Sequence, residues 1–114
     1  MALEVNGKTL ETDGNGNLVD PNAWDEDVAR AIAAADDTMD ELTAEHIDVL
    51  KYLREEYFSN NGNQPMERQI NKEMSKIWGR KLSSKDLYKL FPGAPSKQGN
   101  RIAGLPYVAR KGGY

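Results

Sequence analysis

Residues 88–106 read YKLFPGAPSKQGNRIAGLP, and this stretch combines two opposing features. Three prolines and three glycines interrupt it, so it cannot form one continuous helix. It also carries large apolar side chains at Leu90, Phe91, Ile102 and Leu105, which an unattached chain end would not need. A segment that is both broken and apolar is expected to pack onto its own domain or to bind a partner.

The chain around this stretch is expected to form a single domain over residues 1–114, with residues 93–114 as a C-terminal arm. Its 114 residues are enough to bury a modest core, and 39% of them are hydrophobic. No apolar run is long enough to cross a membrane, and the first residues lack the pattern of a secretory signal. We therefore expect a cytoplasmic protein without a membrane partner.

Charge is distributed unevenly along the sequence. Residues 1–50 contain 13 acidic and 2 basic side chains, a net charge of −11. Residues 51–114 contain 13 basic and 5 acidic side chains, a net charge of +8, which gives −3 overall. The two halves can attract one another within the fold, or they can leave a basic face for an anionic partner.

The fold class expected from local patterns is mainly α, an orthogonal helical bundle with a small N-terminal β-hairpin. Asn6-Gly7 separates two alternating segments, and this dipeptide is a strong signal for a tight hairpin turn. The order of the helices in space comes from a family resemblance described below, because periodicity alone does not fix it.

Five segments carry helical signals. Asp20-Pro21 is typical of a helix cap and first residue, Thr43 caps a helix that ends near residue 58, and Ser83 or Ser84 caps a short helix. A further helix should end at residue 77 or 78, and a short helical piece is expected near residues 97–103. The apolar residues expected to face inward are Val28, Ile32, Ala35, Val49, Leu50, Leu53, Tyr57, Ile70, Met74, Ile77, Leu87, Leu90 and Phe91.

The sequence favours neither a metal site nor a catalytic one. Asp13, Asn15 and Asn17 have the spacing of the start of a calcium loop, but Trp24 stands where an EF-hand places its glutamate. His46 is the only histidine, and we expect it to be a hydrogen-bonded structural residue. We expect no cofactor, no metal and no enzyme activity.

Short sequence pieces along nearly the whole chain resemble one known family. In the C-terminal part they are Leu87-Tyr88, Leu90-Phe91-Pro92, Pro95, Lys97-Gln98 and Ile102-Ala103-Gly104-Leu105-Pro106. Upstream they are residues 5–8, Trp24, Leu42-Thr43, Glu45-His46, Leu53-Arg54, Tyr57, Pro65 and Arg68. Their order and spacing resemble the DsrC/TusE family, also called the gamma subunit of dissimilatory sulfite reductase. The resemblance implies a small sulfur carrier whose mobile C-terminal arm ends in a reactive cysteine.

The sequence departs from this family at the residues that carry its chemistry. The resemblance places the two family cysteines at Asn100 and Lys111, and the whole chain contains no cysteine. Ala94 is a smaller departure, at a position where relatives usually have glycine. A persulfide or a disulfide needs a thiolate, so these residues cannot carry out the family's sulfur transfer.

The first functional hypothesis is a non-catalytic partner-binding or regulatory member of this family. Its partner would be a component of sulfite reductase or of a sulfurtransferase. The arm residues expected to take part are Lys97, Gln98, Arg101, Ile102, Ala103, Gly104, Leu105 and Pro106. The alternative role for Ile102 and Leu105 is to pack the arm onto the bundle. Binding measured with and without the residues after Gln98 would distinguish the two roles.

The second hypothesis is a helix-turn-helix-like, DNA-binding transcriptional regulator of sulfur metabolism. Residues 66–91 read as helix, turn and helix, and they carry a basic patch. The patch consists of Arg68, Lys72, Lys76, Arg80, Lys81, Lys85 and Lys89. Against this hypothesis, the turn is long, and the second helix lacks an obvious Arg/Asn/Gln set for base edges. A solvated basic face is the simpler interpretation.

Overall fold

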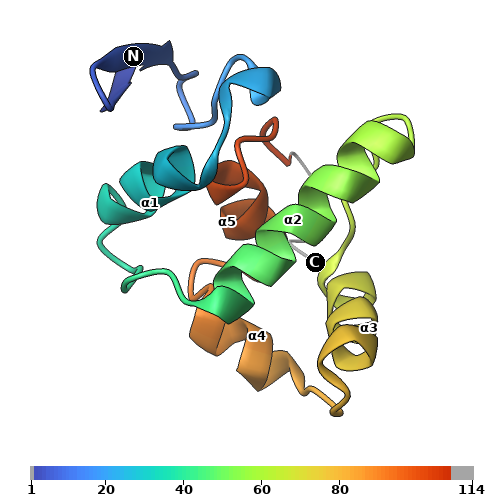
Figure 1. Cartoon of the computed structure of the whole chain (residues 1–114). Coiled ribbons are helices and arrows are strands. Elements are labelled where there is room, and N and C mark those ends of the chain that lie inside the picture. The colour runs from blue at the N-terminus through green and yellow to red at the C-terminus, as the bar shows by residue number, and fades with distance from the viewer. Residues whose placement is uncertain (1, 109–114) are drawn as a thin grey trace.

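The structure is a computed structural model that describes residues 2–108 of the chain. It confirms a mainly helical fold with a two-stranded antiparallel hairpin at its N-terminus (Figure 1). The strands are β1 (Ala2–Val5) and β2 (Lys8–Glu11), and a 3-10 helix, η1, spans Pro21–Ala23. The helices are α1 (Glu26–Ala34), α2 (Ala44–Ser59), α3 (Glu67–Trp78), α4 (Ser84–Leu90) and α5 (Pro95–Ile102).

The hairpin forms at the turn that the sequence predicted. Asn6 and Gly7 both have positive φ, 51° and 80°, and Leu3 pairs with Leu10 across the strands. The hairpin lies at the edge of the molecule, where β1 contacts α1 (Figure 1). No residue from Ala2 to Glu11 is fully buried, so the hairpin contributes little to the core.

Helix α5 lies at the centre of the bundle. It packs against each of the other four helices, and Figure 1 shows it between α1 and α2 with α4 beneath. Six of its eight residues are buried. Residues 88–106 therefore pack onto their own domain. Ile102 and Leu105 are completely buried there, which agrees with the alternative role expected for them.

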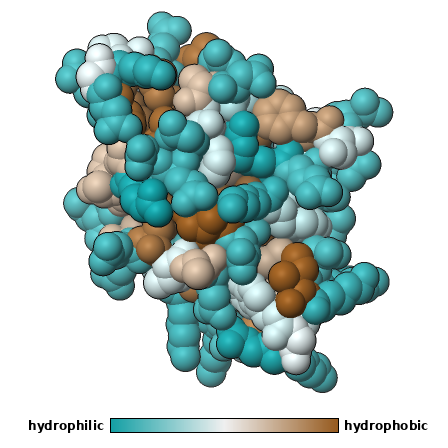
Figure 2. All heavy atoms as spheres, in the orientation of Figure 1, coloured by the Kyte–Doolittle hydropathy of each residue, from teal (hydrophilic) through white to brown (hydrophobic). Residues whose placement is uncertain are grey.

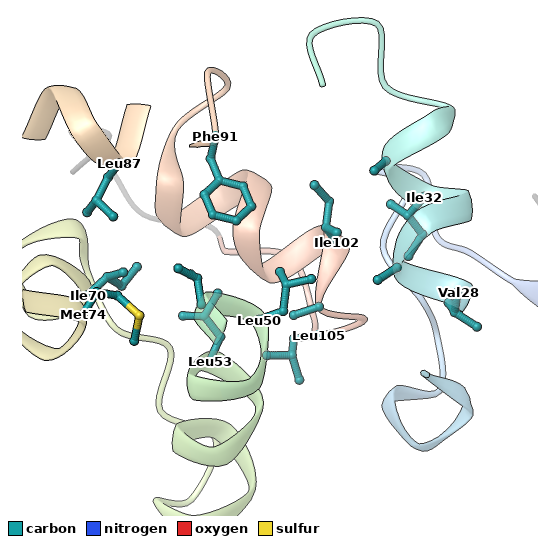
Figure 3. Close-up of a cluster of buried hydrophobic side chains, with 14 of the residues drawn as sticks. Val28, Ile32, Leu50, Leu53, Ile70, Met74, Leu87, Phe91, Ile102 and Leu105 are labelled. Carbon is teal, nitrogen blue, oxygen red and sulfur yellow. The ribbon is translucent and has the colours of Figure 1, made fainter. Parts of the chain in front are cut away.

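The hydrophobic core joins side chains from all five helices and from the turn after α5. Figure 3 shows Ile102 and Leu105 between Leu50 of α2 and Ile32 of α1. Ile102, Leu105 and Leu50 are completely buried. Burying a large apolar side chain is worth roughly 1.5–3 kcal/mol, so the arm side chains contribute substantially to stability.

The first helix begins later than the sequence predicted. Asp20 caps only the short η1, whereas Asp25 is the N-cap of α1 and accepts a hydrogen bond from the Val28 amide at 2.9 Å. Trp24 separates η1 from α1, because its extended backbone (φ −83°, ψ 142°) does not continue a helix. Its indole donates a hydrogen bond to the Ile102 carbonyl of α5. The cap pattern at Asp20-Pro21 cannot predict this contact, because Trp24 and Ile102 are far apart in the sequence.

Two residues expected to face inward do not, because Ile77 is 55% exposed and Ala35 is exposed. Tyr57 and Leu90 are half-buried and pack against the edge of the core. Ile77 lies near the C-terminal end of α3, where a groove with charged walls separates α3 from α2. Ala35 follows the last residue of α1, and the buried face of that helix is shifted to Val28, Ala29, Ile32 and Ala33.

Helices α2 and α4 begin at the caps that the sequence predicted, whereas α3 and α5 have no side-chain cap and α5 begins at Pro95, two residues before the predicted segment. Thr43 caps α2 and Ser83 caps α4, each in a reciprocal capping arrangement. In α2 the reciprocal partner is His46, whose Nδ1 accepts a hydrogen bond from the Thr43 amide at 2.9 Å. His46 Nε2 lies 2.8 Å from the Leu90 carbonyl oxygen, so the ring also joins α2 to the end of α4. His46 is a buried, hydrogen-bonded residue, as expected.

The visible surface is mostly hydrophilic. Figure 2 shows separate apolar patches surrounded by polar side chains. The large apolar residues that remain exposed among residues 2–108 are Val19, Phe58, Met66, Ile77, Tyr88 and Tyr107. Within the same residues, no helix combines the length and the apolar character needed to cross a bilayer.

Candidate functional site

The candidate site is the arm, and its entry is a sharp turn followed by α5. Pro95 occupies the first helical position, where a missing N–H costs nothing. Ala94 before it has φ 91° and ψ 121°, a backbone conformation that favours glycine. This conformation predicts strain at Ala94 in this chain.

Asn100, where the resemblance places a family cysteine, is completely buried in α5. Its Nδ2 donates to the Ser96 carbonyl at 2.7 Å, and its Oδ1 accepts from Gln64 Nε2 at 3.3 Å. The side chain therefore has both a donor and an acceptor satisfied by the protein. Lys111, the other family position, lies outside the described residues.

Gln98 connects α5 to two loops. Its Oε1 accepts a hydrogen bond from the Gly93 amide at 2.7 Å, and its Nε2 donates to Asp36 at 2.7 Å and to Thr38 at 2.8 Å. The side chain is only 1% exposed. An amide suits this position because it offers both an acceptor and two donors to fixed neighbours.

Asp36 is held by α5 in its ionised form. Burial alone would raise the pKa of this carboxyl group, but hydrogen bonds from Gln98 and Thr38 outweigh it and keep the pKa below its ordinary value. The positive charge of Arg101 acts in the same direction, with Nη2 of Arg101 at 3.4 Å from Oδ2 of Asp36. The loop after α1 is thus tied electrostatically to the arm.

Four side chains from the rest of the domain bind the backbone carbonyls that follow α5. Trp24 Nε1 donates to Ile102 at 2.8 Å, and Arg54 Nη1 donates to Ala103 at 2.9 Å. Asn17 Nδ2 donates to Leu105 at 2.9 Å, and Gln64 Nε2 donates to Pro106 at 2.8 Å. We call Asn17, Trp24, Arg54 and Gln64 the carbonyl donors. Trp24 and Arg54 satisfy acceptors at the end of α5 that the helix leaves unpaired, and Asn17 and Gln64 bind carbonyls of the turn that follows.

Arg54 is the most connected of the carbonyl donors. Its second nitrogen donates to the Pro21 carbonyl at 2.9 Å, and its guanidinium lies 4.5 Å from the centre of the Trp24 ring and 5.0 Å from that of Phe58. Burial lowers the pKa of this guanidinium. Arg54 had no predicted role, because its partners are far away along the chain and no local motif marks it.

The predicted arm residues therefore divide into two groups. Gln98 and residues 102–105 are buried, so in this conformation they hold the arm in place. Lys97 is exposed, and Arg101 and Pro106 are partly exposed. Tyr107, which the sequence analysis did not select, is 44% exposed, and its ring lies 5.8 Å from Lys97 Nζ. A partner that met this conformation would contact this second group.

The predicted basic patch does not form one uninterrupted set of free cations. Arg80 pairs with Glu45 at 2.8 Å, while Arg68 and Lys72 line a groove between α3 and α4 together with Glu67. Lys72 and Lys76 line the neighbouring groove between α2 and α3. All seven members of the patch are exposed.

The part of the chain that the structure describes contains no set of side chains that could bind a metal ion. Among residues 2–108, no three His, Asp or Glu side chains come together in a way that could hold an ion. The turn at residues 13–17 instead uses its carboxylate internally. Asp13 Oδ1 accepts hydrogen bonds from the amides of Asn15 and Asn17, at 2.8 and 3.0 Å.

Comparison with known proteins identifies the family. The sequence model described as "DsrC like protein" matches residues 4–109. Sulfurtransferase TusE of Salmonella typhimurium is 43% identical over 105 residues, which cover 91% of this chain and 94% of that protein. The TusE homolog of Haemophilus influenzae is 36% identical over 108 residues, covering 95% and 97% respectively.

Solved structures agree with the sequence comparison. The oxidized gamma subunit of dissimilatory sulfite reductase (DsrC) from Archaeoglobus fulgidus superposes with a TM-score of 0.87 at 37% identity, covering 96% of this chain and 98% of that one. Allochromatium vinosum DsrC gives a TM-score of 0.84 at 40% identity over the same shares of the two chains. This chain therefore belongs to the DsrC/TusE family of sulfur-relay proteins, as a member without cysteine.

Proposed function

We propose that this chain is a non-catalytic family member that binds a component of the sulfur-relay machinery without carrying sulfur. The observation that carries the proposal is the absence of cysteine from the 114 residues, together with a buried amide at Asn100, where the resemblance places a family cysteine. The conserved architecture supports the binding role, and the missing thiol supports the absence of transfer.

The chemistry of sulfur transfer explains the second half of the proposal. Sulfane sulfur moves when a thiolate attacks it, and the acceptor must later release it. The amide nitrogen of Asn100 is a poor nucleophile, and it already donates to the Ser96 carbonyl. Methionine sulfur carries two carbon substituents, so it cannot hold a transferable sulfane in the same way. The residues of this chain therefore offer no carrier atom.

The identity of the partner follows from what the relatives are called. They are named as sulfurtransferases and as the gamma subunit of dissimilatory sulfite reductase, so we infer a sulfurtransferase or sulfite reductase component as the partner. In the packed conformation the accessible Lys97, Arg101 and Tyr107 would supply the contacts. The buried residues of α5 would act indirectly, by fixing these side chains in place.

The proposal is tested by measuring affinity for purified sulfurtransferase and sulfite reductase components from the same organism. We expect saturable binding that Lys97→Glu weakens. Lys85→Glu is the matched control, because it makes the same charge change on the exposed face of α4. Absence of binding to every component, or equal effects of both variants, would contradict the proposed binding surface.

Removal of all residues after Gln98 is not a suitable control. That truncation would also remove Ile102 and Leu105, which are completely buried, so lost binding could reflect an unfolded domain. A competition assay avoids this problem. The intact chain should slow sulfur transfer to a cysteine-bearing relative while accepting no sulfur itself, and unchanged transfer at saturating concentrations would argue against a shared docking site.

The DNA-binding alternative receives no comparable support. The relatives are named for sulfur transfer and sulfite reduction, and Arg80 of the basic patch is already paired with Glu45. We therefore propose a protein partner only.

A further inference from the structure

A small pocket lies between the turn at residues 13–17 and the accessible face of α5. Its volume is about 150 Å³. The residues that line it are Asn15, Asn17, Gly93, Lys97, Arg101 and Tyr107. Two of these side chains are cationic and two are amides, and the lining includes no carboxylate. Asn100 does not line the pocket, whereas Asn17, Gly93 and Arg101 both line it and make the contacts of the arm described above.

The two cations come from successive turns of α5. Lys97 and Arg101 are four residues apart, so they project from the same face of the helix. Among residues 2–108, no carboxylate oxygen lies within 4.0 Å of Lys97 Nζ. Arg101 pairs with Asp36 through one nitrogen only, and a guanidinium has five N–H donors. Positive charge is therefore available to a ligand in the pocket.

The turn at residues 13–17 is arranged to present amides to the pocket. The Asp13 carboxylate is engaged by the backbone amides of Asn15 and Asn17, and it does not line the pocket. The side chain of Asn17 is fixed by its hydrogen bond to the Leu105 carbonyl. Gly16 has a positive φ of 82°, which favours glycine in this turn, and its Cα side faces Arg101, because a Cβ atom added there would be in ordinary contact with the Arg101 Cδ atom at 3.6 Å.

We propose that this pocket binds a small, doubly charged tetrahedral oxyanion such as sulfate or phosphate. Lys97 and Arg101 supply charge-assisted hydrogen bonds, and the Asn15 side-chain amide supplies a neutral donor. A water molecule in the liquid has a share of about 30 Å³, so a pocket of about 150 Å³ accommodates one such ion with bridging water. The proposal does not depend on partner binding.

The experiment is an NMR titration of the ¹⁵N-labelled chain with sodium sulfate and, separately, sodium phosphate. Sodium chloride at matched ionic strength is the reference, because it separates oxyanion binding from general screening. We expect saturable shifts of the Arg101 Nε and Asn15 side-chain signals with both oxyanions. Lys97→Gln should weaken the affinity about tenfold, since it removes one charged donor.

Two comparisons make the result decisive. Lys89→Gln removes an exposed lysine of α4 that does not line the pocket, so it should keep the wild-type affinity. Asn15→Ala should weaken binding less than Lys97→Gln, because a neutral donor is lost. The proposal is overturned if chloride causes the same shifts, if the shifts centre on α3 and α4, or if Lys97→Gln and Lys89→Gln bind equally well.

Discussion

The N-terminal hairpin has a strong local sequence signal but little burial, whereas α5 has a weak local signal and is largely buried. The hairpin has the clearest local signal, yet none of its residues from Ala2 to Glu11 is fully buried. The α5 region is interrupted by glycine and proline, yet it packs against all four other helices. The strength of a local signal therefore does not measure how much a segment contributes to the core. Long-range contacts decide that contribution.

Among the changes considered, removal of a core side chain from the arm should lower the free energy of unfolding the most. Leu105→Ala deletes a completely buried side chain and should destabilise the domain by about 2–5 kcal/mol. Val5→Ala in the half-buried face of the hairpin should cost less than about 1 kcal/mol. Urea unfolding measures both values, and equal losses would show that the arm is not the centre of the core.

Two glycines with similar backbones offer a sharper comparison. Gly104 has φ 74° and Gly7 has φ 80°, so alanine at either position carries a strain of about 1–2 kcal/mol. At Gly104 the added Cβ would also lie 2.5 Å from Trp24 Cδ1, which adds an overpacking cost of about 1–3 kcal/mol. A Cβ atom added at Gly7 would have no atom within 4 Å beyond the glycine and its two chain neighbours. Gly104→Ala should therefore lower the urea midpoint more than Gly7→Ala does.

Ala94→Gly should stabilise the protein, in contrast to most substitutions in the arm. Its φ of 91° favours glycine, and relief of this strain is worth about 1–2 kcal/mol. The greater entropy of glycine in the unfolded chain destabilises the folded state by about 0.5–1 kcal/mol and so offsets part of this gain. A net gain of up to about 1.5 kcal/mol is expected in urea unfolding, and a loss of stability would mean that the turn before α5 is not strained.

The smallest expected effect concerns the pH dependence of the contact between Asp36 and the arm. The pKa of Asp36 is lowered in the fold, so the ionised form stabilises the folded state. This contribution is present above the ordinary aspartate pKa of about 3.9 and is lost as the pH falls through the lower, folded value. Asp36→Asn should flatten the loss of stability below about pH 4. Parallel pH profiles for both proteins would contradict this assignment.

The sequence predicted those features that depend on neighbouring residues. The Asn6-Gly7 turn and the caps at Thr43 and Ser83 involve residues within one turn of each other, and each is confirmed. The family resemblance, and with it the fold class, is also confirmed. These signals are local, or they are carried by the order of short motifs.

The contacts that fix the candidate site could not be predicted in this way. Trp24 and Ile102 are 78 residues apart, and Asn17 and Leu105 are 88 residues apart. Helical periodicity placed Ile77 in the core because it continues the pattern of Ile70 and Met74, but the polar groove between α2 and α3 leaves it exposed. The arrangement of distant segments, which periodicity does not describe, decides both outcomes.

The most direct test of the central claim is native mass spectrometry of this chain mixed with a persulfide-charged sulfurtransferase component. We predict a non-covalent complex in which the mass of this chain is unchanged, because its residues include no thiol that could accept sulfur. Release of this chain with one or more added sulfur atoms would contradict the account, and so would the absence of a complex with every relay and sulfite reductase component tested.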